Sequence, residues 1–157
     1  MIAGDRTLEL RIPPLLLVAL CAAAMFGCAR LLPSLDFALP GRLAGAVVLA
    51  GAGIGIATAG VATFRRHGTT VNPLTPDATA MLVSGGIYRV SRNPMYLGML
   101  VLLAGWALWL ANAAAPLLLP LFVAYLNRFQ IAPEERLLLA RFGPQFAHYM
   151  ATVRRWL

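Results

Sequence analysis

Four long apolar segments alternate with polar connections along the chain. They cover residues 14–32, 43–64, 96–113 and 116–129. A helix needs about 20 apolar residues to cross the hydrocarbon core of a bilayer; the first three segments approach or reach that length, and the fourth is short. The pattern therefore predicts an all-α integral membrane protein with about four transmembrane helices.

The polar residues predict how these helices are connected. Residues 112–115 leave room only for a tight turn, so the third and fourth segments should form a helical hairpin. Pro120 lies inside the fourth segment and predicts a kink or a tilted, incomplete span. The connection over residues 65–95 is long, polar and interrupted by prolines and glycines, which favours a functional loop. The tail over residues 134–157 is amphipathic and is interrupted at Gly143-Pro144, which indicates interfacial helices.

The composition supports a membrane protein. Hydrophobic residues make up 60% of the 157 residues and charged residues only 12%, against roughly a quarter in ordinary soluble proteins. The mean hydropathy of +0.75 is too high for a soluble domain of this size. The net charge of +7 comes from arginines at the ends of apolar segments, where anionic lipid headgroups explain them better than nucleic acid does.

The placement of the arginines predicts the orientation. With the N-terminus in the cytoplasm, eleven of the thirteen basic residues lie on the inner side and only Arg30 and Arg42 lie outside, as the positive-inside rule requires. Both termini, the connection over residues 65–95 and the tail are then cytoplasmic. All thirteen basic residues are arginine, which is typical of a GC-rich bacterial genome, so we expect the bacterial inner membrane.

Small residues in the second segment predict close helix packing. Gly41 and Gly45, and Gly51 and Gly55, are small-xxx-small pairs of the kind that let membrane helices approach each other.

Metal binding is not expected. Neither His67 nor His148 has a Cys, an Asp or a second His at ligand spacing. Asp36 falls in the outer connection, where we expect it to be solvated.

A first candidate binding feature is the run Arg92-Asn93-Pro94-Met95-Tyr96. Pro94 disfavours a helical conformation at Asn93, so the third helix should begin at Pro94. Its free N–H groups and positive dipole end then lie beside Arg92, which suits an anionic group such as a carboxylate. The same residue types also anchor the ends of ordinary membrane helices at the headgroups.

A second candidate feature is Glu134-Glu135, the one adjacent acidic pair of the chain. After Pro133, two acidic residues are what any helix start favours. Beside a membrane surface that repels anions, however, they also suit a cationic ligand group or a hydrogen-bonding ribose. Under the predicted orientation both features lie on the cytoplasmic side.

The order of these motifs resembles the isoprenylcysteine carboxyl methyltransferase family. The resemblance rests on Thr70–Pro73, Leu82–Tyr88, Arg92–Gly98, Pro133–Glu135 and the ending Phe142-Gly143, Phe146, Tyr149 and Val153–Trp156. Phospholipid N-methyltransferases look similar over the same core. The resemblance covers residues 65–157, a methyltransferase core, and leaves residues 1–64 as an N-terminal two-helix transmembrane hairpin.

The resemblance implies S-adenosylmethionine as the cofactor, held on the cytosolic side. It places Leu82, Val83 and Tyr88 in the wall of the cofactor site. It implies that the adenosine or methionine part is bound by Asn93, Pro94, Met95 and Tyr96. It also implies that Glu134 and its neighbour Glu135 contact polar groups of the cofactor. Arg92 is our candidate for the methionine carboxylate or for an acidic group of the substrate.

Two positions depart from the family pattern. Asn93 stands where members often have His, which keeps hydrogen bonding but removes base chemistry. Gln130, with Arg128 nearby, stands where the eukaryotic prenylcysteine enzymes place an Arg that meets the substrate carboxylate. Gln130 and Arg128 are therefore our candidates for substrate contact, and no catalytic residue is assigned.

The reaction implied is in-line methyl transfer to a lipophilic acceptor from the bilayer, a carboxyl, thiol or amine, with positioning as the main contribution of the protein. Two rivals stay open. One is an NADPH-dependent membrane sterol or lipid reductase, which ends in a similar Asn-Pro-x-Tyr motif. The other is a non-catalytic four-helix membrane protein, although no apolar segment has an acidic residue in its interior for proton-coupled export.

Overall fold

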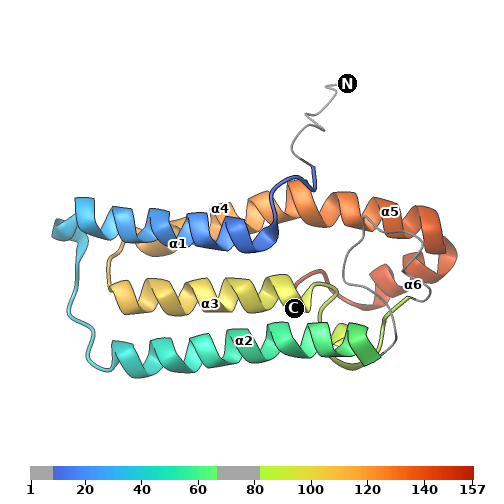
Figure 1. Ribbon diagram of the computed structural model, residues 1–157, viewed down its shortest axis with the longest axis horizontal. Coiled ribbons are helices and arrows are strands. Elements are labelled where there is room, and N and C mark those ends of the chain that lie inside the picture. The colour runs from blue at the N-terminus through green and yellow to red at the C-terminus, as the bar shows by residue number, and fades with distance from the viewer. Residues whose placement is uncertain (1–8, 67–81) are drawn as a thin grey trace.

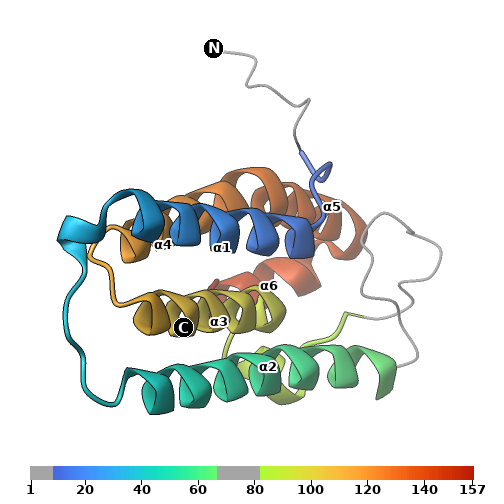
Figure 2. The ribbon, with the colours of Figure 1, turned by 60° about the vertical axis from the view of Figure 1, so that its left-hand side comes forward.

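The computed structural model describes residues 9–66 and 82–157, and every regular element in those ranges is helical. The long helices lie side by side (Figures 1 and 2), which confirms the all-α prediction. The α-helices of these ranges are α1 (Pro14–Leu31), α2 (Arg42–Arg66), α3 (Pro94–Leu110), α4 (Leu118–Tyr125), α5 (Ala132–Phe142) and α6 (Pro144–Thr152). Short turns are η2 (Pro33–Leu35), η4 (Gly86–Arg89) and η5 (Ala115–Leu117), and η6 (Leu126–Ile131) is a π-helical turn.

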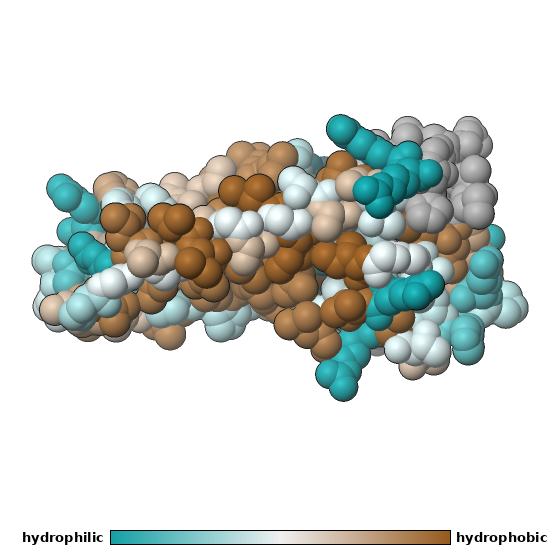
Figure 3. Space-filling view, turned by 90° about the horizontal axis from the view of Figure 1, so that it is seen from below, coloured by the Kyte–Doolittle hydropathy of each residue, from teal (hydrophilic) through white to brown (hydrophobic). Residues whose placement is uncertain are grey.

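Three helical runs are long and apolar enough to cross a membrane within the described ranges. They cover Pro14–Leu31, Arg42–Arg66 and Ala115–Phe142. The remaining apolar helix, α3, has 17 residues and is about 25 Å long. The surface in Figure 3 is apolar across its middle and hydrophilic toward its two ends. The membrane character is thus supported, while the count of four spans and their orientation stay predictions.

Glycines bring α2 and α3 into backbone contact. A Cβ atom on Gly53 would lie 2.6 Å from the Gly98 carbonyl oxygen, and one on Gly98 would lie 2.5 Å from that of Gly53. Gly51 and Gly55 have open space around them. Of the two predicted pairs, only Gly45 contacts α3, through Leu108. The close packing is confirmed, but the sequence pattern selected the wrong face of α2.

The sequence suggested that the fourth helix ends near residue 129, but in the structure the helix continues. The chain stays helical from Ala115 to Phe142. Pro120 is the third residue of α4 and lies in the first turn of that helix, where a residue without an N–H is best tolerated. Pro133 follows the π turn η6, whose wider winding accommodates a residue that cannot donate.

The tail forms two helices, α5 and α6, with the predicted break at Gly143-Pro144; their interfacial position stays a prediction. Gly143 separates them with a φ of +50°, a conformation that glycine adopts without strain. Pro144 then begins α6, at the position where a proline is best tolerated.

The end of the bundle remote from α6 is held by polar contacts. Asn112 is 1% exposed, and its amide donates to the Asp36 carboxylate at 2.7 Å and to the Leu32 carbonyl at 2.9 Å. Asp36 is exposed, as expected, but it also has a structural role that the sequence did not predict, because this contact joins the α1–α2 connection to the α3–α4 hairpin. The hairpin itself was predicted correctly.

Candidate functional site

Two segments that lie far apart in the sequence meet at the α6 end of the bundle. Tyr96, in the first turn of α3, donates its hydroxyl to Oε1 of Glu134 in α5 at 2.5 Å. Asn93 ends the preceding loop and Pro94 begins α3, as predicted. The two polar features of the sequence therefore form one site, as the proposed ligand requires.

A cavity of about 70 Å³ opens beside this contact. Known small-molecule sites measure about 300–1,000 Å³, so a large ligand would have to widen it. Loop, helix-end and tail residues all contribute to its wall. The lining residues are Phe64, Leu82, Val83, Tyr88, Arg92, Asn93, Glu134, Glu135, Leu138, Phe142, Phe146 and Tyr149.

Seven of the predicted cofactor residues line this cavity, namely Leu82, Val83, Tyr88, Arg92, Asn93, Glu134 and Glu135. Pro94, Met95 and Tyr96 do not. Met95 packs toward Gly60 of α2, and Pro94 is buried at the start of α3. Tyr96 acts on the cavity only through Glu134. The motif Thr70–Pro73 lies outside the described residues.

Two buried donors in the cavity wall have no hydrogen-bond partner among the described residues. They are the Tyr88 hydroxyl and the Arg92 Nε–H. Tyr88 is only 4% exposed, and the edge-on Phe64 ring packs against it with centroids 5.2 Å apart. Burial raises the pKa of the Tyr88 phenol above its usual range, so it stays a donor at neutral pH. Because unpaired buried polar groups are unfavourable, both donors indicate a ligand with acceptor atoms.

Glu134 supplies the opposite kind of group. Its carboxyl group accepts from Tyr96, and no guanidinium pairs with it among the ion pairs of the described residues. An acidic group without a basic partner suits a ligand cation. The lining of the cavity thus offers both an acceptor and unpaired donors.

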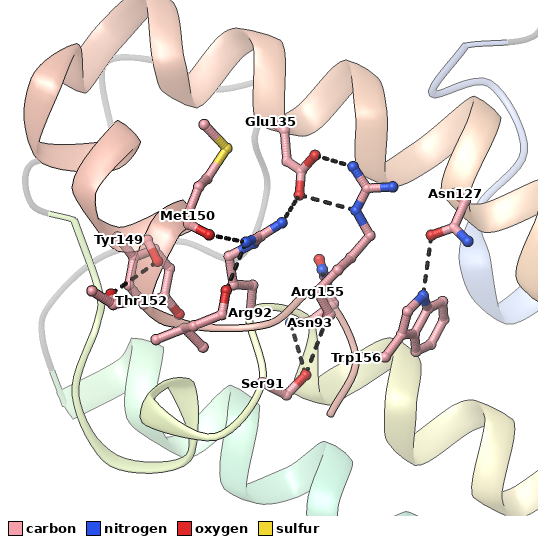
Figure 4. A network of polar contacts seen from close by, with 11 residues as sticks. Ser91, Arg92, Asn93, Asn127, Glu135, Tyr149, Met150, Thr152, Arg155 and Trp156 are labelled. Carbon is pink, nitrogen blue, oxygen red and sulfur yellow. Dashed lines mark hydrogen bonds and ion pairs between the residues drawn. The ribbon is translucent and has the colours of Figure 1, made fainter.

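Arg92 and Glu135, by contrast, are paired with each other. Arg92 Nη2 donates to Oε1 of Glu135 at 2.8 Å, and Arg92 Nη1 donates to the carbonyl oxygens of Met150 and Val153 at 2.7 and 2.6 Å. Arg155 also binds both Glu135 oxygens, at 3.2 and 2.5 Å. Figure 4 shows this network. The sequence did not predict it, because Arg155 was noted only as part of a family ending.

The aromatic wall of the cavity was also missed. Phe142, Phe146 and Tyr149 come from the two tail helices, where the amphipathic pattern indicated only a membrane-facing side. The Tyr149 hydroxyl donates to the Tyr88 carbonyl oxygen at 2.6 Å. Burial raises the pKa of Tyr149 to about 12. Their spacing, with aromatic residues every three or four positions, was the available signal.

The two predicted substrate residues lie elsewhere. Gln130 is 3% exposed and donates to the Ile12 carbonyl oxygen at 2.7 Å. Arg128 pairs with Glu9 at 3.3 Å. Both residues therefore bind the segment before α1, and neither lines the cavity. Their contact with a substrate stays a prediction.

Metal ligands are not gathered at this site. Within the described ranges, no three His, Cys, Asp or Glu side chains lie close enough to hold an ion. The chemistry of the cavity is that of hydrogen bonds, aromatic surface and one unpaired acidic group.

The described residues thus form an all-helical apolar bundle with a cavity at one end, whose mainly apolar lining carries a few polar groups. Residues 42–145 match the family described as phospholipid methyltransferase. The match covers more than half of the chain, which therefore belongs to the phospholipid methyltransferase family and is indicated to be a membrane methyltransferase. The resemblance found in the sequence is confirmed. The matched region runs from the start of α2 into α6 and holds all of the cavity wall except Phe146 and Tyr149.

A bacterial relative adds sequence similarity without a function. An uncharacterized protein of Haemophilus influenzae is 46% identical over 63 residues, which are 40% of this chain and the whole of that protein. No solved structure was found to be similar to the chain.

Proposed function

We propose that the protein transfers the methyl group of S-adenosylmethionine to a lipophilic acceptor that enters from the bilayer. The observation that carries the proposal is the bipolar cavity, whose lining combines the unpaired donors on Tyr88 and Arg92 with the acidic group of Glu134. A zwitterionic amino-acid moiety needs both kinds of group. Family membership supports methyl transfer, and the cavity chemistry supports this donor.

The residues have separate roles in this proposal. Glu134 receives the cationic part of the cofactor, and Tyr96 holds the Glu134 carboxyl group in place. The Arg92 Nε–H and the Tyr88 hydroxyl donate hydrogen bonds to anionic or neutral acceptor atoms of the cofactor. Leu82 and Val83 pack in one hydrophobic cluster with the aromatic residues of the tail, and this apolar part of the lining excludes water.

When bound, S-adenosylmethionine supplies an electrophilic methyl group on a sulfonium sulfur. The protein then contributes orientation, since direct transfer requires the acceptor atom to lie in line with the breaking bond. A carboxylate acceptor needs no proton removal, whereas an ammonium acceptor must first lose a proton.

Calorimetric titration of the detergent-purified protein tests the cofactor. We expect S-adenosylhomocysteine to bind and NADPH not to bind; the reverse result would support a membrane reductase instead. Radiolabelled methyl donor mixed with lipid extracts and followed by chromatography would then identify the acceptor.

Glu134→Ala tests the site directly. We expect it to abolish S-adenosylhomocysteine binding while the protein stays folded in detergent, with a stability loss of about 1–3 kcal/mol because the buried Tyr96 hydroxyl loses its acceptor. Glu9→Ala is the matched control, since Glu9 pairs with Arg128 and Arg136 away from the cavity. Unchanged affinity in Glu134→Ala would remove this residue from the site.

A further inference from the structure

We propose that Glu135 and Arg155 are positioning residues that act through Arg92 and do not touch the methyl donor. Their role is to fix the Arg92 guanidinium so that its Nε–H faces the cavity and meets the carboxylate of the donor. This inference rests on the proposed function. The sequence suggested that Glu135 contacts the cofactor directly, whereas here Glu135 positions Arg92.

The guanidinium of Arg92 is fixed at two of its three nitrogens. Nη1 donates to the Met150 and Val153 carbonyl oxygens, and Nη2 donates to Glu135. Nε is left buried and without a partner. Because the guanidinium is planar and its donors are rigidly related, holding the two Nη groups also sets the direction of Nε–H.

Both oxygens of Glu135 already bind guanidinium groups. Oε1 accepts from both Arg92 Nη2 and Arg155 Nε, and Oε2 accepts from Arg155 Nη2. Its charge is therefore shared between two guanidinium groups. Although Glu135 borders the cavity, these two pairings make it a weaker partner than Glu134 for a ligand cation.

The segment after α6 completes the arrangement. Residues 153–157 lie across the start of α3 (Figure 4), where the Arg92 backbone N–H donates to the Arg154 carbonyl oxygen and the Asn93 amide donates to that of Arg155, both at 3.0 Å. The Trp156 indole N–H donates to Asn127 at 3.1 Å. Arg155 thus joins this segment to Glu135, and Glu135 joins it to Arg92.

A double-mutant cycle tests the proposal with S-adenosylhomocysteine as the probe. In the otherwise wild-type protein, Glu135→Gln should weaken binding about tenfold, the loss expected when one charge-assisted hydrogen bond is misplaced. Arg155→Ala should weaken it about threefold and Arg155→Lys less, because Arg155 acts at one further remove and is partly exposed. In an Arg92→Lys background, which lacks the Nε–H donor, neither change should weaken binding further.

Arg154→Gln is the control. It lies on the same segment, and its side chain makes only a 3.5 Å contact with the Leu157 carbonyl oxygen. The affinity of the Arg154→Gln variant for S-adenosylhomocysteine should stay within about twofold of that of the wild type. Thermal unfolding of each variant in detergent separates loss of binding from loss of fold.

A thioether analogue of the probe that lacks the α-carboxylate gives a second readout. It should bind the wild type and Glu135→Gln equally, because the group that Arg92 meets is absent. An equal tenfold loss for both ligands would overturn the proposal, as would losses that multiply in the Arg92→Lys background, since Glu135 would then contact the donor itself. Absence of any binding to the wild type would instead overturn the proposed function, and this inference with it.

Discussion

Tyr88 and Tyr149 lie against each other but use their hydroxyl groups differently. The Tyr149 hydroxyl donates to the backbone of Tyr88, whereas the Tyr88 hydroxyl is buried without a partner among the described residues. A hydroxyl of the first kind stabilises the fold, and one of the second kind is available to a ligand. The two side chains therefore allow stability and binding to be separated.

Tyr88→Phe and Tyr149→Phe should have opposite signatures. Tyr88→Phe should leave the thermal unfolding midpoint unchanged or slightly raised and should weaken S-adenosylhomocysteine binding several-fold, because it removes an unpaired donor. Tyr149→Phe should destabilise the protein by about 1 kcal/mol, the usual contribution of one hydrogen bond. Calorimetry and thermal melts in detergent measure both. A Tyr88→Phe protein with full affinity would contradict the proposed use of this hydroxyl.

At the residue scale, sequence motifs predicted which side chains gather but not how they pair. Tyr96 and Glu134 were predicted to share one ligand, and they are in contact. Arg92 and Glu135 were predicted as separate ligand contacts, yet they bind each other. The pairing depends on Arg155 returning across α3, and such a return of the chain leaves no local pattern in the sequence.

The contact between α2 and α3 is the clearest feature at the element scale. Gly98→Ala should destabilise the protein by about 1–3 kcal/mol, because its methyl group would meet the α2 backbone and the helices would have to separate. Gly51→Ala is the matched control on the open face of α2, and it should be neutral or stabilising, since Ala favours helix by up to about 1 kcal/mol. Equal effects on the unfolding midpoint would contradict this packing.

Gln130 tests whether the π turn serves the fold or the substrate. Gln130→Met keeps the size of the side chain but removes the hydrogen bond to Ile12. We expect a loss of about 1–3 kcal/mol, because the Ile12 carbonyl is left unpaired, with no change in S-adenosylhomocysteine affinity. A raised KM for the lipid acceptor at unchanged stability would instead support the substrate role suggested by the sequence.

Periodicity and proline positions predicted most helix starts but not the length of the fourth helical run. Pro94 and Pro144 begin α3 and α6 as expected. Pro133 looked like another helix start, but the π turn before it lets the helix continue. A change in helical winding depends on tertiary packing, so hydrophobic patterns do not register it.

The arrangement of the whole molecule makes a topological prediction. The α1–α2 connection and the α3–α4 turn lie at one end, and the site lies at the other (Figures 1 and 2). In a variant without Cys21 and Cys28, a cysteine at Ser34 should react with a membrane-impermeant maleimide added to spheroplasts. One at His148 should react only after lysis. Both positions are exposed. Labelling of both before lysis would contradict the predicted cytoplasmic site.

The predicted division of the chain can be compared with its packing. The division into a hairpin over residues 1–64 and a core over residues 65–157 stays a prediction, and α2 packs along α3 across it. The family match also begins at Arg42 rather than near residue 65. Sequence motifs concentrate where side chains bind a ligand. They therefore did not identify α2 as part of the core, because α2 contributes glycines that allow close packing against α3.

The π turn has a consequence for how the helix that carries Glu134 tolerates changes in length. Successive residues of an α-helix are rotated by about 100° around its axis, and a π turn holds the surplus of a single inserted residue. Deleting one amino acid between Leu126 and Ile131 would remove that surplus and restore regular winding, with little rotation of the two glutamates that follow. The helix that carries Glu134 should therefore tolerate the loss of one residue at this turn better than at a regular turn, where the same deletion would rotate the glutamates by about 100°.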